Sequence, residues 1–517
     1  MGQAAAKTRP TPSQGLARRR RSLPRCPLAH DLPPALPLPH RPLSLSAACG
    51  DDGGGDTADA STGDTAPATD TATPTTTDAA DSSGGEESSG GGSTGDTGEN
   101  AFPAGGCGLP DYALLPPTDM GEVLDSGFVI HFDPATIDGL LNAQGFGALA
   151  PVAYGADVYK IRYRTQDRGE AVEATGFVSY PTGDAVGERP VVVWAHGTTG
   201  FTDMCGPTAA PDGYVIPALL AALGFVTVAP DYLGLNGWGA PAGFLHPYVV
   251  PEPTAIATLD SLRALVRFAS DTGESVPATP GKDIILFGAS EGGFATLWAD
   301  RYAPYYAPEF KILANVASVP PTDSFGLTRH GATVFGPTTG VLAAAVVGGH
   351  DWYRVADPLS DVLSDNVAAL LPKLMTEDCN ADVPPDITMT NQVYQQSFID
   401  AIVADDIDAL GPVGCILKRA SLATSDLPLM VNTPTLVVLG EADDLVYSPV
   451  VREDLPRLCD QGYVIEHYEC AGAGHVDAAT SSIPFVIGWA NDRLAGKPLV
   501  EPCEIHAPVD CGPAPMP

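Results

Sequence analysis

Basic residues are scarce in this chain. Its 517 residues include 27 Lys and Arg against 63 Asp and Glu, which gives a formal net charge of -36. Because the phosphate backbone of a nucleic acid would be repelled by such a surface, we expect no nucleic-acid partner. Because each copy carries the same net negative charge, we expect copies of the protein to repel one another in solution.

Motifs for metal binding and membrane spanning are also missing. The sequence has no C-x-x-C pair, no H-E-x-x-H motif and no EF-hand loop, so we expect no catalytic metal and no cofactor. No stretch after the N-terminal region reaches the ~18 uncharged apolar residues that a membrane-spanning helix needs. The sequence therefore predicts no transmembrane helix.

The first 49 residues resemble an export leader. A basic run starts at Arg18, a proline-rich apolar stretch follows, and small residues precede Cys49. This order is typical of a secretory signal. Ser46-Ala-Ala-Cys49 resembles a bacterial lipobox, in which the cysteine is lipidated, although leucine is usual where Ser46 stands. The protein is thus expected to be exported, as a cell-surface lipoprotein or in secreted form. A misassigned start or a disordered tail is the alternative.

Residues 50–105 are a low-complexity mixture of Gly, Ser, Thr, Asp and Ala. Such a segment cannot bury enough apolar area to offset the entropy lost on ordering, so we expect a disordered acidic linker.

Eight cysteines remain after the leader, at positions 107, 205, 379, 415, 459, 470, 503 and 511. An even number in an exported protein indicates disulfides, but their pairing cannot be deduced from sequence. Free buried thiols are the alternative.

Strand and helix patterns alternate along the rest of the chain, which indicates a mostly parallel α/β sheet with helices on both faces. We expect a first part of this core at 106–320, a helical cap at 321–428, a second part of the core at 429–500, and a tail at 501–517. The predicted strands are 158–163, 174–180, 190–196, 225–229, 284–287, 311–319, 435–439 and 464–468; the predicted helices of the core are 216–223, 254–269, 449–458, 483–494 and one directly after Ser290.

Ser290 lies in the strongest motif of the chain. Gly288-Ala-Ser290-Glu-Gly292 follows a predicted buried strand and precedes a predicted helix. In a turn of this kind the serine hydroxyl is exposed, and residues 288 and 292 must be small. A second match to the pattern, around Ser93, lies in the predicted linker with no strand before it. We therefore expect Ser290 to be the nucleophile of a serine hydrolase.

A serine nucleophile needs a histidine as base and a carboxylate that orients the histidine. In hydrolases with this turn the chain order is Ser, then Asp or Glu, then His, each after a strand. Asp443 follows the predicted strand 435–439, and His475 follows the strand 464–468. We expect these two as acid and base, with Asp444 or Glu441 as the alternative acid.

The oxyanion of the reaction needs two donors. One is expected from the backbone N–H of Glu291, directly after the nucleophile. The other should come from the loop after the strand 190–196, where Thr198 is our choice and Thr199 the alternative. We expect His196 to shape this loop and Asp231 to act as a structural polar residue nearby.

Several motifs in order resemble the secretory lipase family, the lipase-A-like triacylglycerol lipases. They are Trp194-Ala-His-Gly-Thr-Thr-Gly200, Cys205-Gly-Pro207, Pro230-Asp-Tyr-Leu-Gly-Leu235, His246-Pro-Tyr248, the turn at Ser290, Tyr305-Tyr-Ala-Pro-Glu309, Gly440-x-x-Asp443, Leu458-Cys459 and Gly474-His475.

This resemblance implies an α/β-hydrolase fold whose inserted cap covers an acyl-binding tunnel. It also implies Ser290, Asp443 and His475 as the triad, and Cys379 as the partner of Cys205. Two departures leave the substrate range open: Glu291 stands where the family often has Gln, and Gly-Pro-Thr follows Cys205 instead of Ala-Pro-Ser.

The resemblance implies a hydrolase of fatty-acid esters, either an acylglycerol lipase or a related esterase, that works through an acyl-serine intermediate. Its substrate would be a small-molecule or lipid ester. Alternatives are a carboxylesterase of short-chain or polymeric esters, a peptidase, and a non-catalytic surface-binding lipoprotein with a hydrolase fold.

The lipobox resemblance predicts that the mature protein begins at a lipidated Cys49. Mass spectrometry of the mature protein should find a diacylglycerol-modified cysteine at its N-terminus. An unmodified Cys49, or a mature N-terminus at another residue, would contradict the prediction.

Overall fold

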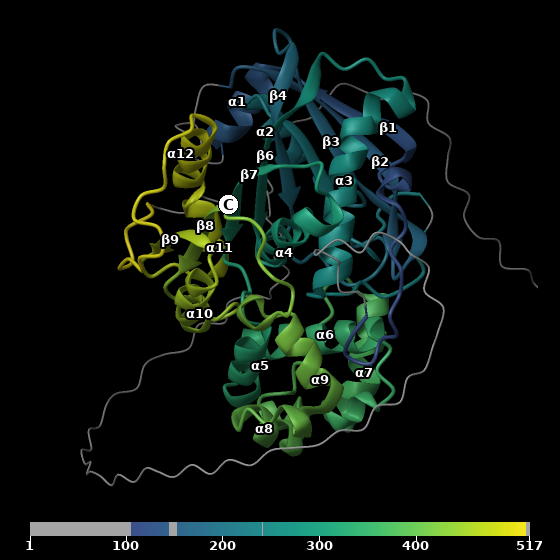
Figure 1. The fold of residues 1–517 in the computed structure, drawn as a ribbon, viewed down its shortest axis with the longest axis vertical. Helices are drawn as coiled ribbons and strands as arrows, with labels where there is room; N and C mark the ends of the chain where they lie inside the picture. Colours follow the sequence, from purple (N-terminus) through teal and green to yellow (C-terminus); the bar gives the residue numbers. More distant parts are fainter. Residues whose placement is uncertain (1–104, 144–151, 240, 513–517) are drawn as a thin grey trace, which may run out of the picture. The chain divides into compact units, whose positions relative to one another are not determined.

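One nine-stranded sheet organises the structure (Figure 1). The computed structural model describes residues 105–143, 152–239 and 241–512, all of which lie in the unit formed by residues 43–517. The predicted leader with Cys49, and the linker with Ser93 up to residue 104, lie outside the described residues.

The sheet is mostly parallel, as the alternation of strands and helices predicted. Its strand order is β1-β2-β3-β5-β4-β6-β7-β8-β9. The strands from β5 onward in this order are parallel, whereas β1, β2 and β3 pair antiparallel with one another and β3 pairs antiparallel with β5. The strands are β1 (Val123–Phe132), β2 (Gly155–Asp167), β3 (Glu170–Thr182), β4 (Gly187–Ala195), β5 (Val226–Pro230), β6 (Ala278–Ala289), β7 (Ile312–Ser318), β8 (Pro434–Gly440) and β9 (Val464–Cys470).

The apolar run in β4 shows why the sheet lies between two layers. Val191 and Val193 pack into one buried cluster, and Val192 and Trp194 pack into another. Successive side chains of a strand point to opposite faces, so a continuous apolar run needs cover on both.

Helices provide this cover. Helices α3 (Pro251–Thr272), α4 (Glu291–Tyr306) and α10 (Ser448–Asp460) contribute to the cluster on one face; α1 (Pro134–Ala143), α2 (Val215–Ala222) and α12 (Ile483–Leu494) contribute to the cluster on the other. Among the described residues, no helix is both long and apolar enough to cross a bilayer.

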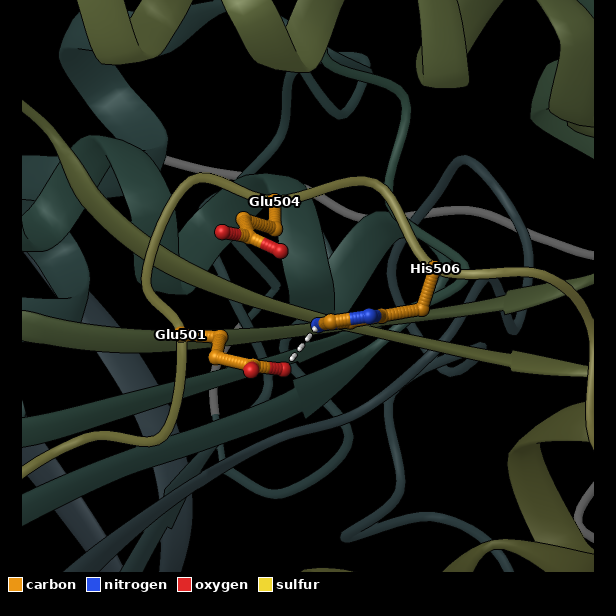
Figure 2. Close-up of side chains that lie close together, drawn as sticks. All are labelled: Glu501, Glu504 and His506. Carbon is orange, nitrogen blue, oxygen red and sulfur yellow. Dashed lines mark ion pairs between the residues drawn. The ribbon is translucent and has the colours of Figure 1, made fainter.

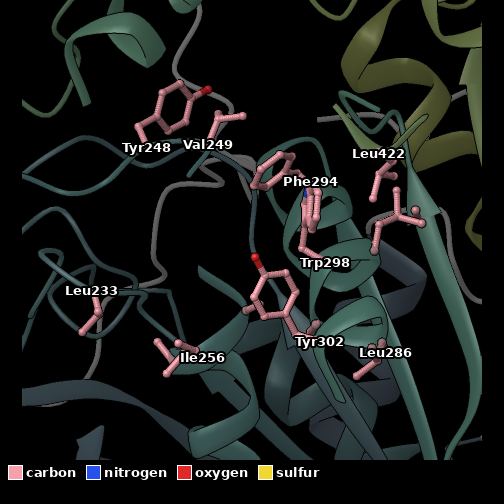
Figure 3. Packing of buried hydrophobic residues seen from close by; sticks show 14 of the residues in the cluster. Leu233, Tyr248, Val249, Ile256, Leu286, Phe294, Trp298, Tyr302 and Leu422 are labelled. Carbon is pink, nitrogen blue, oxygen red and sulfur yellow. The ribbon is translucent and has the colours of Figure 1, made fainter. Parts of the chain in front are cut away.

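Helix α4 is anchored by an aromatic stripe. Phe294, Trp298 and Tyr302 recur at a spacing of four residues, and their ring centroids are 5.9 and 5.8 Å apart (Figure 3). Residues at this spacing lie on one side of a helix. All three are buried in the larger cluster, which fixes the position of the helix that follows Ser290.

The chain between β7 and β8 forms helices and no strand. These are α5 (Ser324–Thr333), α6 (Pro337–Trp352), α7 (Asp365–Glu377), α8 (Gln396–Val403) and α9 (Ile407–Arg419), with short 3-10 turns between them. Figure 1 shows them gathered below the sheet. The two ends of the insertion lie side by side. Ser421 Oγ donates to Asp323 Oδ1 at 3.0 Å, and Leu422 N donates to Thr322 O at 2.9 Å.

Four disulfides connect these parts: Cys107–Cys415, Cys205–Cys379, Cys459–Cys503 and Cys470–Cys511. The expectation of disulfides and the pairing of Cys205 with Cys379 are both confirmed. The first two attach the helical insertion to distant parts of the chain, and the last two hold the C-terminal tail against α10 and β9. Each crosslink stabilises the fold chiefly by restricting the unfolded chain.

The sequence patterns missed β1 and two helices of the core, α1 and α11 (His475–Ser481). Strand β1 lies at the edge of the sheet, and most of its side chains are only partly buried. It also carries two irregularities in its register with β2, so its sequence shows no clean alternation. Helix α11 is seven residues long, too short to display a helical period.

Asp300 supplies a test of the packing on α4. Its carboxyl group is buried, Thr433 Oγ1 donates to it at 2.7 Å, and burial raises its pKa to about 7. A raised pKa means that the native state keeps a proton that the unfolded chain releases from about pH 4 upward, so stability falls as the pH rises through about 7. At about 1.4 kcal/mol for each pKa unit, the loss by pH 8 is on the order of 4 kcal/mol.

We therefore expect Asp300→Asn, which keeps an acceptor for Thr433, to raise the melting temperature at about pH 8 and to change it little at about pH 4. Thermal unfolding across this range checks the prediction, with the exposed Asp283→Asn as the matched control. An equal effect at both pH values would contradict it.

Candidate active site

Ser290 occupies a strained turn between β6 and α4. Its φ is 58°, in the left-handed region that residues with a side chain seldom adopt. A backbone hydrogen bond ties the turn to the end of β7, because Ser290 N donates to Ser318 O at 2.8 Å. The strand-to-helix corner expected for this serine is therefore present.

The two flanking glycines are required by close backbone contacts. A Cβ atom on Gly292 would overlap the carbonyl oxygen of Ala195 and come within 2.7 Å of that of His196. A Cβ atom on Gly288 would overlap the carbonyl of Gly292. A side chain at position 292 would push the turn away from β4, and one at position 288 would force the turn itself open.

Three side chains from separate loops form one hydrogen-bonded chain. Ser290 Oγ lies 2.9 Å from His475 Nε2, and His475 Nδ1 lies 2.7 Å from Asp443 Oδ2. His475 and Asp443 are buried. Since a carboxylate accepts, Nδ1 carries the proton, and the lone pair of Nε2 faces the serine. This is the arrangement in which histidine can take the proton of a serine hydroxyl.

Asp443 is the acid that reaches the histidine. Its second oxygen, Oδ1, accepts hydrogen bonds from Leu445 N and Val446 N, each at 3.0 Å. The side chains of Asp444 and Glu441 are exposed. Glu441 accepts instead from Gly472 N at 2.8 Å, which links the loop after β8 to the loop that carries His475.

The loop after β4 lies against the turn at Ser290. A Cβ atom on Gly197 would be 3.6 Å from Ser290 Cβ, an ordinary contact. The next residue, Thr198, has its hydroxyl 2.9 Å from the hydroxyl of Tyr248. Glu291 begins α4, and the first N–H groups of a helix have no acceptor within it. The structure thus brings both predicted oxyanion residues near the serine, and their role as donors stays a prediction.

His196 and Asp231 have contacts within the protein that fit the structural roles expected of them. His196 Nδ1 lies 2.6 Å from Gly197 O, and its ring stacks on that of Tyr232. Asp231 is fully buried and accepts from Thr175 Oγ1 at 2.6 Å and from Thr208 N at 3.0 Å. Burial raises the pKa of Asp231, and the two threonine hydroxyls that donate to it oppose this shift.

Sequence patterns did not identify the contacts that support the site. His246 pairs at 2.7 Å with Glu291, the residue directly after Ser290. Thr338, at the start of α6, donates to Asp444 O at 2.6 Å, so the helical insertion contacts the acid loop. The one sequence signal for these contacts was the motif that contains His246. This motif contributed to the family resemblance, but the resemblance assigned no role to His246.

One cluster has the geometry of a metal site. Among the described residues, only Glu501, Glu504 and His506 bring three ligating groups within 4.8 Å of one another (Figure 2). They lie on the C-terminal tail, and two of the three are exposed. An ion pair at 4.0 Å joins His506 to Glu501. None of them belongs to the hydrogen-bonded chain at Ser290, and we assign the cluster no role in its chemistry.

Comparison with protein families matches residues 204–502 to a model described as secretory lipase. The similar curated proteins include a probable inactive lipase of Mycobacterium tuberculosis, 27% identical over 293 residues that cover 56% of this chain and 59% of that protein. Lipase A of Arthroderma benhamiae is 26% identical over 288 residues, which cover 54% of this chain and 55% of that protein. The matched region thus spans 55–59% of these relatives' length.

Solved structures share the fold. The rice cell wall degrading esterase LipA from Xanthomonas oryzae superposes with a TM-score of 0.58 at 19% identity, over 73% of this chain and all of that chain. Candida antarctica lipase A in its closed state gives a TM-score of 0.55 at 18% identity, over 76% of this chain and 85% of that chain. The predicted α/β-hydrolase fold is confirmed.

The geometry predicts that Asp443, and not its neighbour, tunes the reactivity of Ser290. Asp443→Asn should slow covalent labelling of Ser290 by a fluorophosphonate by roughly a thousandfold or more, because Nδ1 loses its acceptor and the wrong tautomer is favoured. The exposed Asp444→Asn should stay within about twofold of the wild type, as the matched control. Equal rates for the two variants would contradict the assignment of the acid.

Proposed function

The chain belongs to the secretory lipase family, and we propose that it is a serine hydrolase that cleaves carboxylic esters through an acyl-serine intermediate. The observation that carries this proposal is the hydrogen-bonded chain from Ser290 through His475 to Asp443. A nucleophile, a base and an orienting acid are present together and in the required order.

In the proposed mechanism, Ser290 Oγ attacks the ester carbonyl while His475 Nε2 accepts the hydroxyl proton. Asp443 holds the histidine in the productive tautomer and stabilises the imidazolium that forms. His475 then donates the proton to the leaving alcohol. A water molecule then enters, loses a proton to the same nitrogen and attacks the acyl-serine. His475 returns this proton to Ser290 Oγ as the acid leaves, which restores the free serine.

Negative charge develops on the carbonyl oxygen during both steps. We assign its stabilisation to the backbone N–H groups of Glu291 and Thr198. The first lies at the N-terminus of α4, where the helix dipole and unpaired N–H groups favour an anion. The second lies in the loop that contacts Ser290 from the side of β4. Preorganised donors of this kind cost no reorganisation when the oxyanion forms.

We propose lipid esters, and acylglycerols in particular, as the substrate class. This is supported by the family and by the relatives named lipases. Residues 321–428 are proposed to form a cap beside the site, between core segments 106–320 and 429–500. Two contacts support that placement: Thr338 bonds the acid loop, and the Cys205–Cys379 disulfide joins the insertion to the loop after β4.

Two observations support second candidates. A structural neighbour is a cell wall degrading esterase, which fits the alternative of polymeric or short-chain esters. A relative is named a probable inactive lipase, which fits a non-catalytic binding protein. The intact Ser290–His475–Asp443 chain favours the enzyme over the binding protein.

The protein is expected to work outside the cytoplasm. Its four disulfides are typical of oxidising compartments, and its family is described as secretory. Lipid anchoring through Cys49 remains part of the proposal.

The decisive test compares wild type with Ser290→Ala on tributyrin and on a long-chain triglyceride. We expect hydrolysis by the wild type and a loss of at least about a thousandfold in the variant, since the acyl-serine cannot form. A series of p-nitrophenyl esters of increasing chain length distinguishes a lipase from a short-chain esterase.

A fluorophosphonate probe tests the non-catalytic alternative. The probe should label Ser290 in the wild type and fail to do so in His475→Ala. Absence of labelling in the wild type, or labelling that is unchanged in His475→Ala, would exclude the proposed mechanism.

A further inference from the structure

A histidine is buried together with the carboxyl group of Glu291, the residue that directly follows the nucleophile. The side chains of His246 and Glu291 are both fully shielded from solvent. His246 Nε2 lies 2.7 Å from Glu291 Oε1, and His246 Nδ1 lies 2.6 Å from the carbonyl oxygen of Leu233. Glu291 Oε2 is buried with no hydrogen-bond partner among the described residues.

These distances determine how many protons the pair holds. A carbonyl oxygen can only accept, so Nδ1 carries a hydrogen. Between Nε2 and Oε1 there must be a second one, since two lone pairs would otherwise face each other at 2.7 Å. It can reside on either atom, giving an imidazolium with a carboxylate or a neutral imidazole with a carboxylic acid. The net charge of the pair is zero in both cases.

Glu291 is also the residue whose backbone N–H is proposed to bind the oxyanion. Its side chain leaves the same Cα atom, so the bond to His246 restricts the orientation of the peptide between Ser290 and Glu291. The neutrality of the pair matters as well. An unpaired carboxylate at this place would repel the negative charge that develops a few ångströms away, in a setting that screens charge poorly.

Ring contacts connect His246 with the residue that begins the loop containing Thr198. The ring of Tyr232 stacks with that of His246, with centroids 6.0 Å apart, and with that of His196, with centroids 4.4 Å apart. Tyr232 OH donates to His196 O at 2.9 Å. Burial raises the pKa of Tyr232 well above its usual value, so the hydroxyl keeps its proton. His196 begins the loop that presents Thr198.

We propose that His246 is a positioning residue that holds Glu291 through one shared proton. Through this bond and the stack with Tyr232 and His196, it sets the separation of the N–H groups of Glu291 and Thr198. The inference rests on the proposed ester hydrolysis, because it assigns these two groups to the same oxyanion. What the site requires of residue 291 is a side chain that reaches His246 and leaves the pair neutral.

Two substitutions at position 291 separate the contact with His246 from the acidity of the side chain. In Glu291→Gln the side-chain amide can donate to Nε2 of a neutral His246, so both the reach and the neutrality are kept. Glu291→Asp keeps the acid and shortens the side chain by one methylene, about 1.5 Å, so the bond at 2.7 Å is lost. We expect kcat of the aspartate variant to be roughly 10–100-fold below kcat of the glutamine variant, with KM within about threefold in both.

Two substitutions of His246 test the same contact from the other residue. In His246→Gln the side-chain amide takes the place of Nε2, and its oxygen can accept the proton of the acid form of Glu291, which keeps both the contact and the neutrality of the pair. The amide nitrogen of His246→Asn takes the place of Nδ1 and keeps only the bond to Leu233. The glutamine variant should retain most of the activity and the asparagine variant should lose it. If Glu291→Asp fails to fold, the two His246 variants still show whether the contact affects catalysis. Melting temperatures of all four variants establish which of them are folded.

The measurements are kcat and KM on a p-nitrophenyl ester, together with the inhibition constant of a trifluoromethyl ketone. The ketone forms a tetrahedral adduct with the serine, so its affinity should fall in parallel with kcat/KM in the two variants that lose the contact. If aspartate at 291 and asparagine at 246 match their glutamine counterparts in kcat and ketone affinity, the proposal is overturned. An inactive wild type would refute the proposed function instead.

Discussion

The close approach of the serine turn to β4 is the constraint on which the site depends. Gly292 lies against the carbonyl oxygens of Ala195 and His196 so tightly that no side chain fits between them. This contact presses the first turn of α4 onto the end of the neighbouring strand and brings Ser290 next to the loop that follows β4. The positive φ of Ser290 is the cost of this arrangement, and the buried aromatic stripe of α4 helps to offset it.

Sequence patterns predicted the strands of the sheet except β1, at one edge. A parallel strand covered on both faces is a continuous apolar run, and β4, β6 and β8 are recognisable for this reason. Strand β1 has partial cover and an irregular register, so its residues follow neither pattern. The helical insertion was recognised only because the alternation stopped; its internal order depends on packing between helices, which a local period does not encode.

The contacts of the candidate site also include some that could be predicted from the sequence and some that could not. Ser290, Asp443 and His475 could be predicted because each follows a strand, and parallel strands bring their carboxyl ends to one edge. The pair of His246 with Glu291 could not, since 45 residues separate the two and their contact arises only when α4 packs beside the loop after β5. Glu291 looked like a departure from a family pattern. In the structure it is buried and pairs with His246.

The helical insertion is held on both sides of the site, and this limits how the site can open. On one side the Cys205–Cys379 disulfide packs against Gly200, at the end of the loop that presents Thr198. On the other side Thr338 bonds the acid loop, and His330 of α5 stacks on Tyr447 with ring centroids 3.7 Å apart. A rigid swing of the whole insertion would break these contacts together. Under the proposed function, an opening that admits a long acyl chain would come from the helices between these attachments, while the loops that hold Ser290, Asp443 and Thr198 stay in place.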